Sequence, residues 1–513
     1  MNYDNKINKI EIKNDEYYLK LIRLEQNNKE TYQKYGEYLF DQKRYSKAEE
    51  HYLKAIEIDP NYSDSCYSLG NLYKKQKKYI EAEQYYLRTI NLDSKNSKCY
   101  SDLALLLTEL KRKIEAEEYY LKAIELDPGN SDYYNFLGLL LSELKREKEA
   151  EEYFIKAIKL NSSNVHTYNN LGELYTDLER YKEAEEYLLR GMELDQTNFD
   201  TQYNLGSLYK SQKRYKESED CYLKAIKIDQ NKDNVYSNIG ILYFITKRYN
   251  EAEESFLKAI EINPTYINAY YNLGRLYKDI KREKEAGEIY LKILDLDPTF
   301  LHAYNSLGDL HFDMGRLKEA EEYHLKALKI DPNYEFSNFN LGFIYTNQKR
   351  YKEAEASYLK AIESNPKNSN AYNNYGLLLR DDLERYTDAE ENFIKAIKLN
   401  NKDSNYYTNL ANVYRSLERY DLAEINYFQS IKLNPGDDKT NYYIGSLYDI
   451  LDRHKLAEKF YLKALKLNKN TKYFNSSYGN FLQSSLGKEL EAEKYLKKLI
   501  KILFNMILLL ILL

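Results

Sequence analysis

Apolar and polar residues along this chain follow the period of a helix, in blocks that recur about every 34 residues. In the block that starts at 165–178, Tyr168, Leu171 and Tyr175 fall within one arc of roughly 100° on a helical projection, a stripe wide enough to be buried. A second helical pattern follows at 181–194, with acidic residues in its first turn, as the helix dipole favours. Each block therefore predicts two helices joined by a short turn.

A small residue marks the same position of every block, and we call it the glycine slot and count positions from it. The slot is filled, in chain order, by Gly36, Gly70, Ala104, Gly138, Gly172, Gly206, Gly240, Gly274, Gly308, Gly342, Gly376, Ala411, Gly445 and Gly479. The spacing between successive slots is constant except for one longer step, where an extra aspartate in the pair Asp381 and Asp382 lengthens the turn. Such a period is typical of stacked repeats, so we predict fourteen units forming one continuous domain over residues 29–500.

The breaks between units confirm this frame within the sequence. All seven prolines fall at position +24 from a glycine slot, where their missing amide donor would end the second helix. At the crossing of the two helices we expect Gly172 to face Ala184 and Gly274 to face Ala286, so that the two backbones approach closely.

These residues resemble the signature of the tetratricopeptide repeat family. One unit carries almost all of it, with Tyr270, Leu273, Gly274, Tyr277, Ala286, Tyr290 and Pro298, while Ile293 replaces the second alanine. The resemblance covers about residues 29–500. It implies an all-α fold, a right-handed superhelical solenoid of helix-turn-helix units, with a concave groove formed by the first helices.

The two ends depart from the repeat. Residues 1–28 begin with a polar segment that has no signal-peptide core, so we expect an intracellular, cytoplasmic protein. Residues 15–24 match the second helix of a unit, with Tyr18 in the aromatic position, and predict a half repeat that caps the array. The apolar tail at 501–513 is too short to cross a bilayer; the alternatives are a final helix folded on the array, a truncated end, or a shallow membrane anchor.

Composition excludes several classes of function. The net charge of −5, from 76 basic and 81 acidic residues, argues against a nucleic-acid partner, and three cysteines in 513 residues exclude a disulfide framework. No phosphate-binding loop, zinc motif or nucleophile with a base is present, so we expect no enzyme, no catalytic residues, no cofactor and no metal site. Three histidines, His302, His311 and His324, share one unit, and we interpret the last two as substitutes for tyrosine that are buried and have their hydrogen bonds satisfied, rather than as metal ligands.

Positions −6, −2, +1 and +5 lie about 100° to about 160° around the helix from the glycine slot and are predicted to line the groove. Asparagine fills position −2 in seven units, at Asn170, Asn204, Asn238, Asn272, Asn340, Asn374 and Asn409. An amide offers a donor and an acceptor to a peptide backbone, and the set resembles the asparagine ladder in the repeat arm of O-linked N-acetylglucosamine transferase. The alternative is a coding bias that spreads asparagine throughout the chain.

Two aromatic residues stand on the same predicted face, since Phe336 and Phe343 are seven residues apart on one helix. We expect them, with the asparagines, to form a peptide-binding site. Acidic residues outnumber basic ones by 15 to 5 at the four groove positions, which favours a neutral or basic peptide. The alternative for the two rings is scattered exposure without a role.

The sequence therefore predicts a non-catalytic scaffold that binds extended peptide segments of other proteins, without nucleic acid. Two alternatives stay open: the recognition arm of a glycosyltransferase-type enzyme complex, and a membrane-tethered assembly factor held by the apolar tail.

Overall fold

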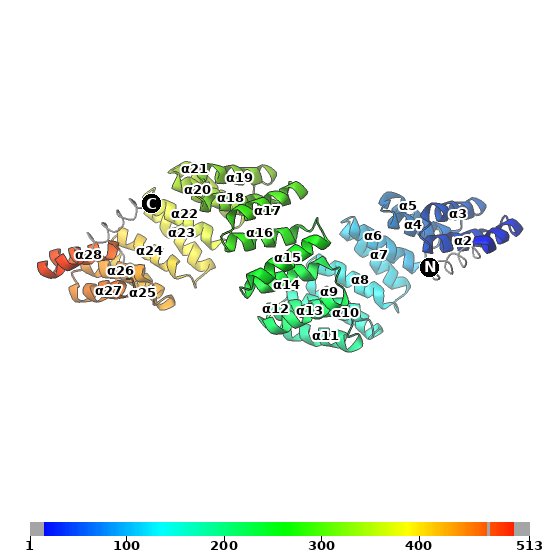
Figure 1. The fold of residues 1–513 in the computed structure, drawn as a ribbon, viewed down its shortest axis with the longest axis horizontal. Coiled ribbons are helices and arrows are strands. Elements are labelled where there is room, and N and C mark those ends of the chain that lie inside the picture. The colour runs from blue at the N-terminus through cyan, green and yellow to red at the C-terminus, as the bar shows by residue number, and fades with distance from the viewer. Residues whose placement is uncertain (1–14, 469–471, 497–513) are drawn as a thin grey trace. The chain divides into compact units, whose positions relative to one another are not determined.

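The computed structural model describes residues 15–468 and 472–496, and within these ranges it consists of helices joined by short turns (Figure 1). Two helices alternate in each unit, as predicted. The first helices are α2 (Lys29–Asp41), α4 (Ser63–Lys75), α6 (Ser97–Glu109), α8 (Ser131–Glu143), α10 (Val165–Asp177), α12 (Phe199–Ser211), α14 (Asp233–Ile245), α16 (Ile267–Asp279), α18 (Leu301–Asp313), α20 (Glu335–Asn347), α22 (Ser369–Asp381), α24 (Ser404–Ser416), α26 (Asp438–Ile450) and α28 (Lys472–Ser484).

The second helices are each one residue longer than the first. They are α3 (Tyr45–Ile58), α5 (Tyr79–Leu92), α7 (Lys113–Leu126), α9 (Glu147–Leu160), α11 (Tyr181–Leu194), α13 (Tyr215–Ile228), α15 (Tyr249–Ile262), α17 (Glu283–Leu296), α19 (Leu317–Ile330), α21 (Tyr351–Ser364), α23 (Tyr386–Leu399), α25 (Tyr420–Leu433) and α27 (His454–Leu467). Residues 489–496 are helical as well.

The unit of α10 and α11 shows why these residues fold as they do. The side chain of Asn164 caps α10 by accepting a hydrogen bond from the His166 amide at 3.1 Å. The predicted stripe of Tyr168, Leu171 and Tyr175 is buried against α11. The observed helix boundaries lie within one residue of those predicted from periodicity.

The turn inside each unit places one residue in the left-handed region of backbone conformation. That residue is glycine in two of the described units, Gly315 at φ 74° and Gly487 at φ 64°, whereas most units use lysine, as at Lys213 with φ 62°. A side chain costs energy in this region, and backbone hydrogen bonds hold the turn, as where the amide of Arg214 donates to the carbonyl of Tyr209 at 2.8 Å. The turns between units end the second helix without this conformation, as at Asp59 and Pro60 after α3.

The glycine slot faces the position twelve residues later at the helix crossing, as predicted, but a larger side chain lies closer still. In the unit where serine replaces the crossing alanine, Oγ of Ser218 donates to the backbone oxygen of Gly206 at 2.7 Å. A Cβ atom at Gly274 would lie 2.5 Å from Cε1 of Tyr290, and at Gly172 it would lie 2.5 Å from Cγ of Leu188. The glycine therefore also makes room for a buried side chain of the second helix, sixteen positions later in these units.

A recurring set of polar contacts ties each unit to the next. In one of them, Nη1 of Arg214 donates to both carboxylate oxygens of Glu185 at 2.9 Å, and the guanidinium lies 4.1 Å from the ring centre of Tyr209. The Tyr209 hydroxyl donates to the same carboxylate at 3.1 Å. The same arginine and glutamate pair recurs at Arg112–Glu83, Arg146–Glu117, Arg180–Glu151, Arg248–Glu219, Arg350–Glu321 and Arg419–Glu390.

The N-terminal half repeat forms a helix over the described residues 15–24 and uses these same contacts. Asp15 takes the glutamate position, bonding Arg44 at 2.8 Å and accepting from the Tyr35 hydroxyl at 3.1 Å. Tyr18 stacks on Tyr35 with ring centres 5.1 Å apart. Residues 1–14 and the apolar tail at 501–513 lie outside the described residues.

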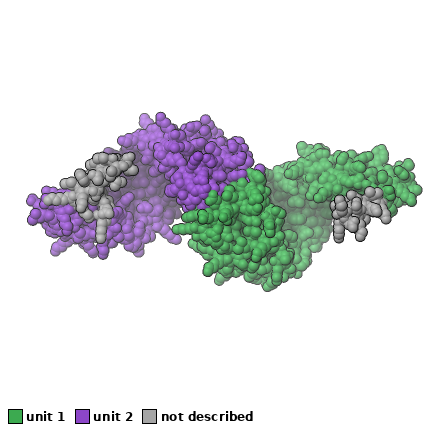
Figure 2. Space-filling view, viewed as in Figure 1, with its two compact units in different colours: residues 1–264 green, residues 265–513 purple. Residues whose placement is uncertain are grey.

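The chain divides into two compact units, residues 1–264 and 265–513, and the boundary follows Pro264 between two repeats (Figure 2). Each compact unit has its own apolar core, in which rings such as Tyr222 and Tyr427 are fully buried. The three cysteines are free and buried, as packing residues. In the part of the chain that the structure describes, every helix is too short or too polar to span a bilayer.

Candidate functional site

The seven predicted asparagines lie on the first helices, and each is partly exposed. In the first compact unit Asn170 donates through Nδ2 to Oδ1 of Asn135 at 2.9 Å. Asn135 belongs to the preceding unit, where it occupies position −3. This asparagine therefore joins two neighbouring first helices.

The same link recurs at the other asparagines of this compact unit. Nδ2 of Asn204 donates to the backbone oxygen of Asn169 at 3.4 Å, and Nδ2 of Asn238 donates to the Tyr203 hydroxyl at 2.7 Å. Both acceptors again lie at position −3 of the preceding unit. The asparagine donor is thus used inside the stack of repeats.

In the second compact unit, Asn409 donates to Oδ1 of Asn373 at 2.9 Å and Asn340 donates to Oδ1 of Asn305 at 3.1 Å. Asn374 instead accepts from Nδ2 of Asn373 at 3.1 Å, so the chain of amides continues along α22. Asn272 is partly exposed on α16.

Positions −3 and −2 pair in this way with other residue types too. Gln33 donates to Oγ of Ser68 at 2.8 Å, and the Tyr442 hydroxyl pairs with Oγ of Ser477 at 3.1 Å. We call this series the lateral hydrogen bonds. The asparagines therefore help to join neighbouring units, a role that the sequence reasoning missed. The predicted hydrogen bonds to a peptide backbone would then be made mainly by the oxygen atoms of their side chains.

The sequence reasoning also missed position +4, which carries five basic residues and one acidic residue. Lys210 donates to Oδ1 of Asn238 at 2.6 Å, and Nη1 of Arg380 lies 3.3 Å from Oδ1 of Asn409. Position +4 follows groove position +1 by three residues, so the two are neighbours on the helix surface, and the signal in the sequence was a basic residue beside the predicted groove. Basic side chains therefore lie among the acidic ones on the face of the first helices.

Two charged side chains on the first helices have shifted pKa values although solvent reaches them. Glu173 is exposed, yet its pKa is raised, because protein around it reduces hydration and because Asp177 and Asp200 repel its charge. Lys210 keeps partial contact with solvent, yet desolvation lowers its pKa to about 8. The protein around both groups therefore disfavours their charged forms.

The two predicted phenylalanines are exposed on α20, as expected, with 50% of Phe336 and 44% of Phe343 accessible to solvent. Each ring also contacts the preceding unit. The centre of the Phe336 ring lies 6.1 Å from that of His302, and the Phe343 ring centre lies 5.3 Å from that of Phe312. The structure therefore presents two aromatic pairs instead of two isolated rings.

A pocket of about 300 Å³ opens beside Phe343. It is lined by Lys278, Asp309, Phe312, Asp313, His324, Asn340, Phe343 and Ile344. Burial raises the pKa of Asp309 to about 6, and burial lowers the pKa of His324 to about 4. Nε2 of His324 has no hydrogen-bond partner among the described residues, so the expectation of a satisfied histidine is wrong for this atom.

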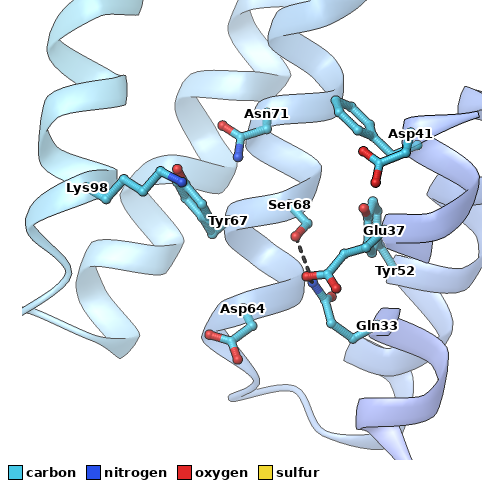
Figure 3. A pocket seen from close by; sticks show the side chains of 10 residues that line it. Gln33, Glu37, Asp41, Tyr52, Asp64, Tyr67, Ser68, Asn71 and Lys98 are labelled. Atoms are coloured by element: carbon cyan, nitrogen blue, oxygen red, sulfur yellow. Dashed lines mark hydrogen bonds between the residues drawn. The ribbon is translucent and has the colours of Figure 1, made fainter. Parts of the chain in front are cut away.

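A second pocket, of about 350 Å³, lies in the first compact unit and is shown in Figure 3. Glu37 and Asp41 of α2 and Asp64 of α4 line it, with Lys98 of α6 at the opposite side. The lateral hydrogen bond from Gln33 to Ser68 crosses its floor. Three carboxylates and one ammonium make this pocket acidic, in agreement with the excess of acidic residues predicted for the groove positions.

Models of the tetratricopeptide repeat match nearly the whole array. The matched residues are 36–77, 63–96, 97–130, 131–164, 163–231, 197–264, 233–299, 302–334, 337–368, 357–391, 378–438 and 439–471. No curated protein matches the chain by sequence.

Solved structures with a similar fold include the Cut9–Hcn1 hetero-tetramer of APC/C, at 15% identity over 91% of this chain and 98% of that one, with a TM-score of 0.46. Yeast Tom70 matches at 18% identity over 85% and 95% of the two chains, with a TM-score of 0.40. Pseudomonas aeruginosa PilF matches at 22% identity over 42% of this chain and 97% of its own, with a TM-score of 0.38.

Proposed function

This chain belongs to the tetratricopeptide repeat family, and on that premise we propose that it is a non-catalytic scaffold that binds extended peptide segments of other proteins on its first helices. The observation that carries the proposal is the pair of exposed rings on α20. Phe336 and Phe343 are about half exposed, although a hydrated surface gains nothing from exposing them. Exposed aromatic residues ringed by polar groups are typical anchors of peptide interfaces.

The surroundings of the two rings supply the polar groups that such an interface needs. Asn340 lies between the rings on α20, and Asn374 lies one unit further along. Oδ1 of Asn340 and the second lone pair on Oδ1 of Asn374 can accept hydrogen bonds from a peptide backbone, while Nδ2 of Asn340 bonds the preceding unit. An apolar peptide side chain would contact both rings and lose its contact with water.

The charge of the groove selects among peptides. In the first compact unit Glu37, Asp41 and Asp64 share one pocket with Lys98, and Glu173 is held close to other carboxylates. A basic peptide relieves this repulsion, whereas an acidic one adds to it. We therefore propose neutral or basic segments as ligands.

The test is binding to an array of immobilised peptides with the exposed rings removed. Phe336→Ala with Phe343→Ala should weaken binding to the retained peptides by about 2 kcal/mol or more, which is roughly 30-fold in Kd. The matched control is Phe428→Ala on α25, because Phe428 is also exposed, at 38%, but lies on a second helix. Equal binding by the double variant and the parent, with unchanged circular dichroism, would show that the rings are not the site.

A further inference from the structure

The pocket beside Phe343 combines charge, a buried acceptor and aromatic walls. It is formed within the second compact unit by α16, α18 and α20, with His324 contributed by α19. Its volume, about 300 Å³, accommodates one long side chain rather than a peptide backbone. The ligand must therefore be a side chain that enters end on.

Among the described residues, the carboxylate of Asp309 has no lysine or arginine within ion-pair distance. Nζ of Lys278 lies 3.1 Å from Asp313, and its charge reaches Asp309 only from further away, where it lowers the pKa of that carboxyl. Asp309 accepts hydrogen bonds from Nδ2 of Asn340 at 2.6 Å and of Asn305 at 3.2 Å, which are neutral donors. A carboxylate that is oriented by two amides but not paired with a base favours a cationic ligand.

His324 closes the pocket behind Asp309. It is fully buried, and its Nε2 lies 3.7 Å from Oδ1 of Asp309, too far for a hydrogen bond. Nδ1 faces Oγ of Ser337 at 3.4 Å. Because Nε2 is itself covered by protein, the carboxylate of Asp309 is the acceptor that a ligand can reach, and the neutral ring behind it supplies no charge to balance it.

Two aromatic side chains form the walls of the pocket. Phe312 and Phe343 lie with ring centres 5.3 Å apart at an interplanar angle of 53°. Aromatic faces attract cations, and a planar cation also stacks on them. An ammonium is a compact charge that stays strongly hydrated, whereas a guanidinium is planar and spreads five donors over a fork.

From this arrangement we propose that the pocket binds the guanidinium of an arginine side chain, with donors to the carboxylate of Asp309 and with its plane against Phe343. The proposal rests on the proposed function, because the arginine belongs to a peptide held on the first helices. It adds a specificity rule, that bound peptides carry arginine next to the apolar residue that contacts Phe336 and Phe343.

The pocket can be tested without knowing the peptide. The full chain is labelled with fluorophenylalanine at its 17 phenylalanines, and the fluorine signals of Phe312 and Phe343 are assigned with Phe312→Leu and Phe343→Leu variants. N-acetyl-arginine amide is added up to about 20 mM, where a site with a Kd of a few mM is nearly filled. N-acetyl-citrulline amide, which has the same shape without the charge, is the matched probe.

We expect the arginine probe to shift the Phe343 signal with a Kd at least ten-fold lower than the citrulline probe. Asp309→Asn should remove this preference, whereas Asp295→Asn, which removes the same charge from an exposed position on the second helix α17, outside the pocket, should keep it. Equal shifts by the two probes, or no shift of Phe343, would overturn the proposal. So would an unchanged preference in Asp309→Asn.

The outcome is separate from that of the peptide array. Suppose that binding to the immobilised peptides requires Phe336 and Phe343, but the pocket does not distinguish the arginine probe from the citrulline probe. The proposed peptide groove is then supported and the proposed arginine pocket is refuted. Suppose instead that the arginine probe binds through Asp309, but binding to the immobilised peptides does not depend on the two rings. The pocket is then supported as a guanidinium site and the groove proposal is refuted.

Discussion

Replacing His324 by phenylalanine should stabilise its repeat, and should do so more at low pH than at neutral pH. The neighbouring units place Tyr290 and Tyr358 at this position, and both are buried like His324. The histidine ring has an unpaired Nε2, and an unsatisfied buried polar group costs about 1–3 kcal/mol. A phenylalanine ring would fill the same volume without that cost, so the gain at neutral pH is expected within this range.

The pH term follows from the pKa of His324, which burial lowers from 6.5 to about 4. The unfolded chain takes up the proton as pH falls through 6.5, but the folded chain does not until about 4. Protonation therefore favours unfolding in this window, and stability present above pH 6.5 is lost on acidification. A pH of about 5 lies about 1.5 pH units below the unfolded pKa, so the loss there is about 2 kcal/mol, and His324→Phe should remove it.

Asp309 acts in the opposite direction, because its pKa is raised to about 6, so that the folded chain takes up its proton first. Its stabilising effect grows as pH falls from about 6. Since 34% of its side chain is exposed, solvent screening reduces this effect and the histidine term dominates. Asp309→Asn should therefore increase the loss between neutral pH and pH 5.

The assay is hydrogen exchange read by mass spectrometry for peptides from α18 and α19, corrected for the intrinsic exchange rate at each pH. A local measurement is needed because an array of repeats does not unfold in one step. The opening constant of the parent should rise up to about 30-fold on going from about pH 7 to about pH 5, and that of His324→Phe should not rise. Equal opening constants of the parent at the two pH values, with the same result in Asp309→Asn, would refute the reasoning.

Three further predictions concern the repeat of α12 and α13. Gly206→Leu should open this repeat and its immediate neighbours, because even its Cβ would lie 2.6 Å from the buried Tyr222 ring; exchange that rises evenly over the whole array would contradict nearest-neighbour stability. Arg214→Ala should cost about 1 kcal/mol locally, less at high salt, because it loses both Glu185 and the stacked tyrosine, and lysine should not rescue it. Cys221 should resist alkylation in the folded chain, because burial raises the pKa of its thiol to about 11. Its alkylation rate should therefore report local opening and should rise in Gly206→Leu. Fast alkylation of the parent protein would contradict this prediction.

The sequence predicted the repeat frame well, because each marker is a local constraint. A proline ends a helix whatever surrounds it, and the period of apolar residues defines the buried stripe, so α10 and α11 were placed within one residue. Side-chain partners across units were not predictable in the same way. The link from Asn170 to Asn135 depends on how two neighbouring helices are offset along their axes, and a projection of one helix does not contain that offset.

The errors at single positions have related causes. Projection places Ala286 and Tyr290 on one face of α17, but it does not show that the tyrosine ring is the nearest neighbour of Gly274. His324 was correctly placed in a buried aromatic position, whereas its unpaired Nε2 depends on which polar groups the neighbouring helices bring near it. The seven asparagines, Phe336 and Phe343 remain predictions as peptide contacts, although their exposure agrees with that role.

The two sets of links between repeats also determine how easily each compact unit bends. The lateral hydrogen bonds join first helices, as in Gln33 to Ser68, and the arginine pairs join a second helix to the following turn, as in Glu185 to Arg214. Because the repeats are connected one after another, small changes of tilt between neighbouring repeats add up to a large bend over several repeats. Polar bonds of about 1 kcal/mol can exchange for water at little cost, which makes the joints soft while the repeats stay rigid. A bound peptide that spans several repeats would therefore pull on the links between them. The length of the peptide would then determine how strongly the stack of repeats curves.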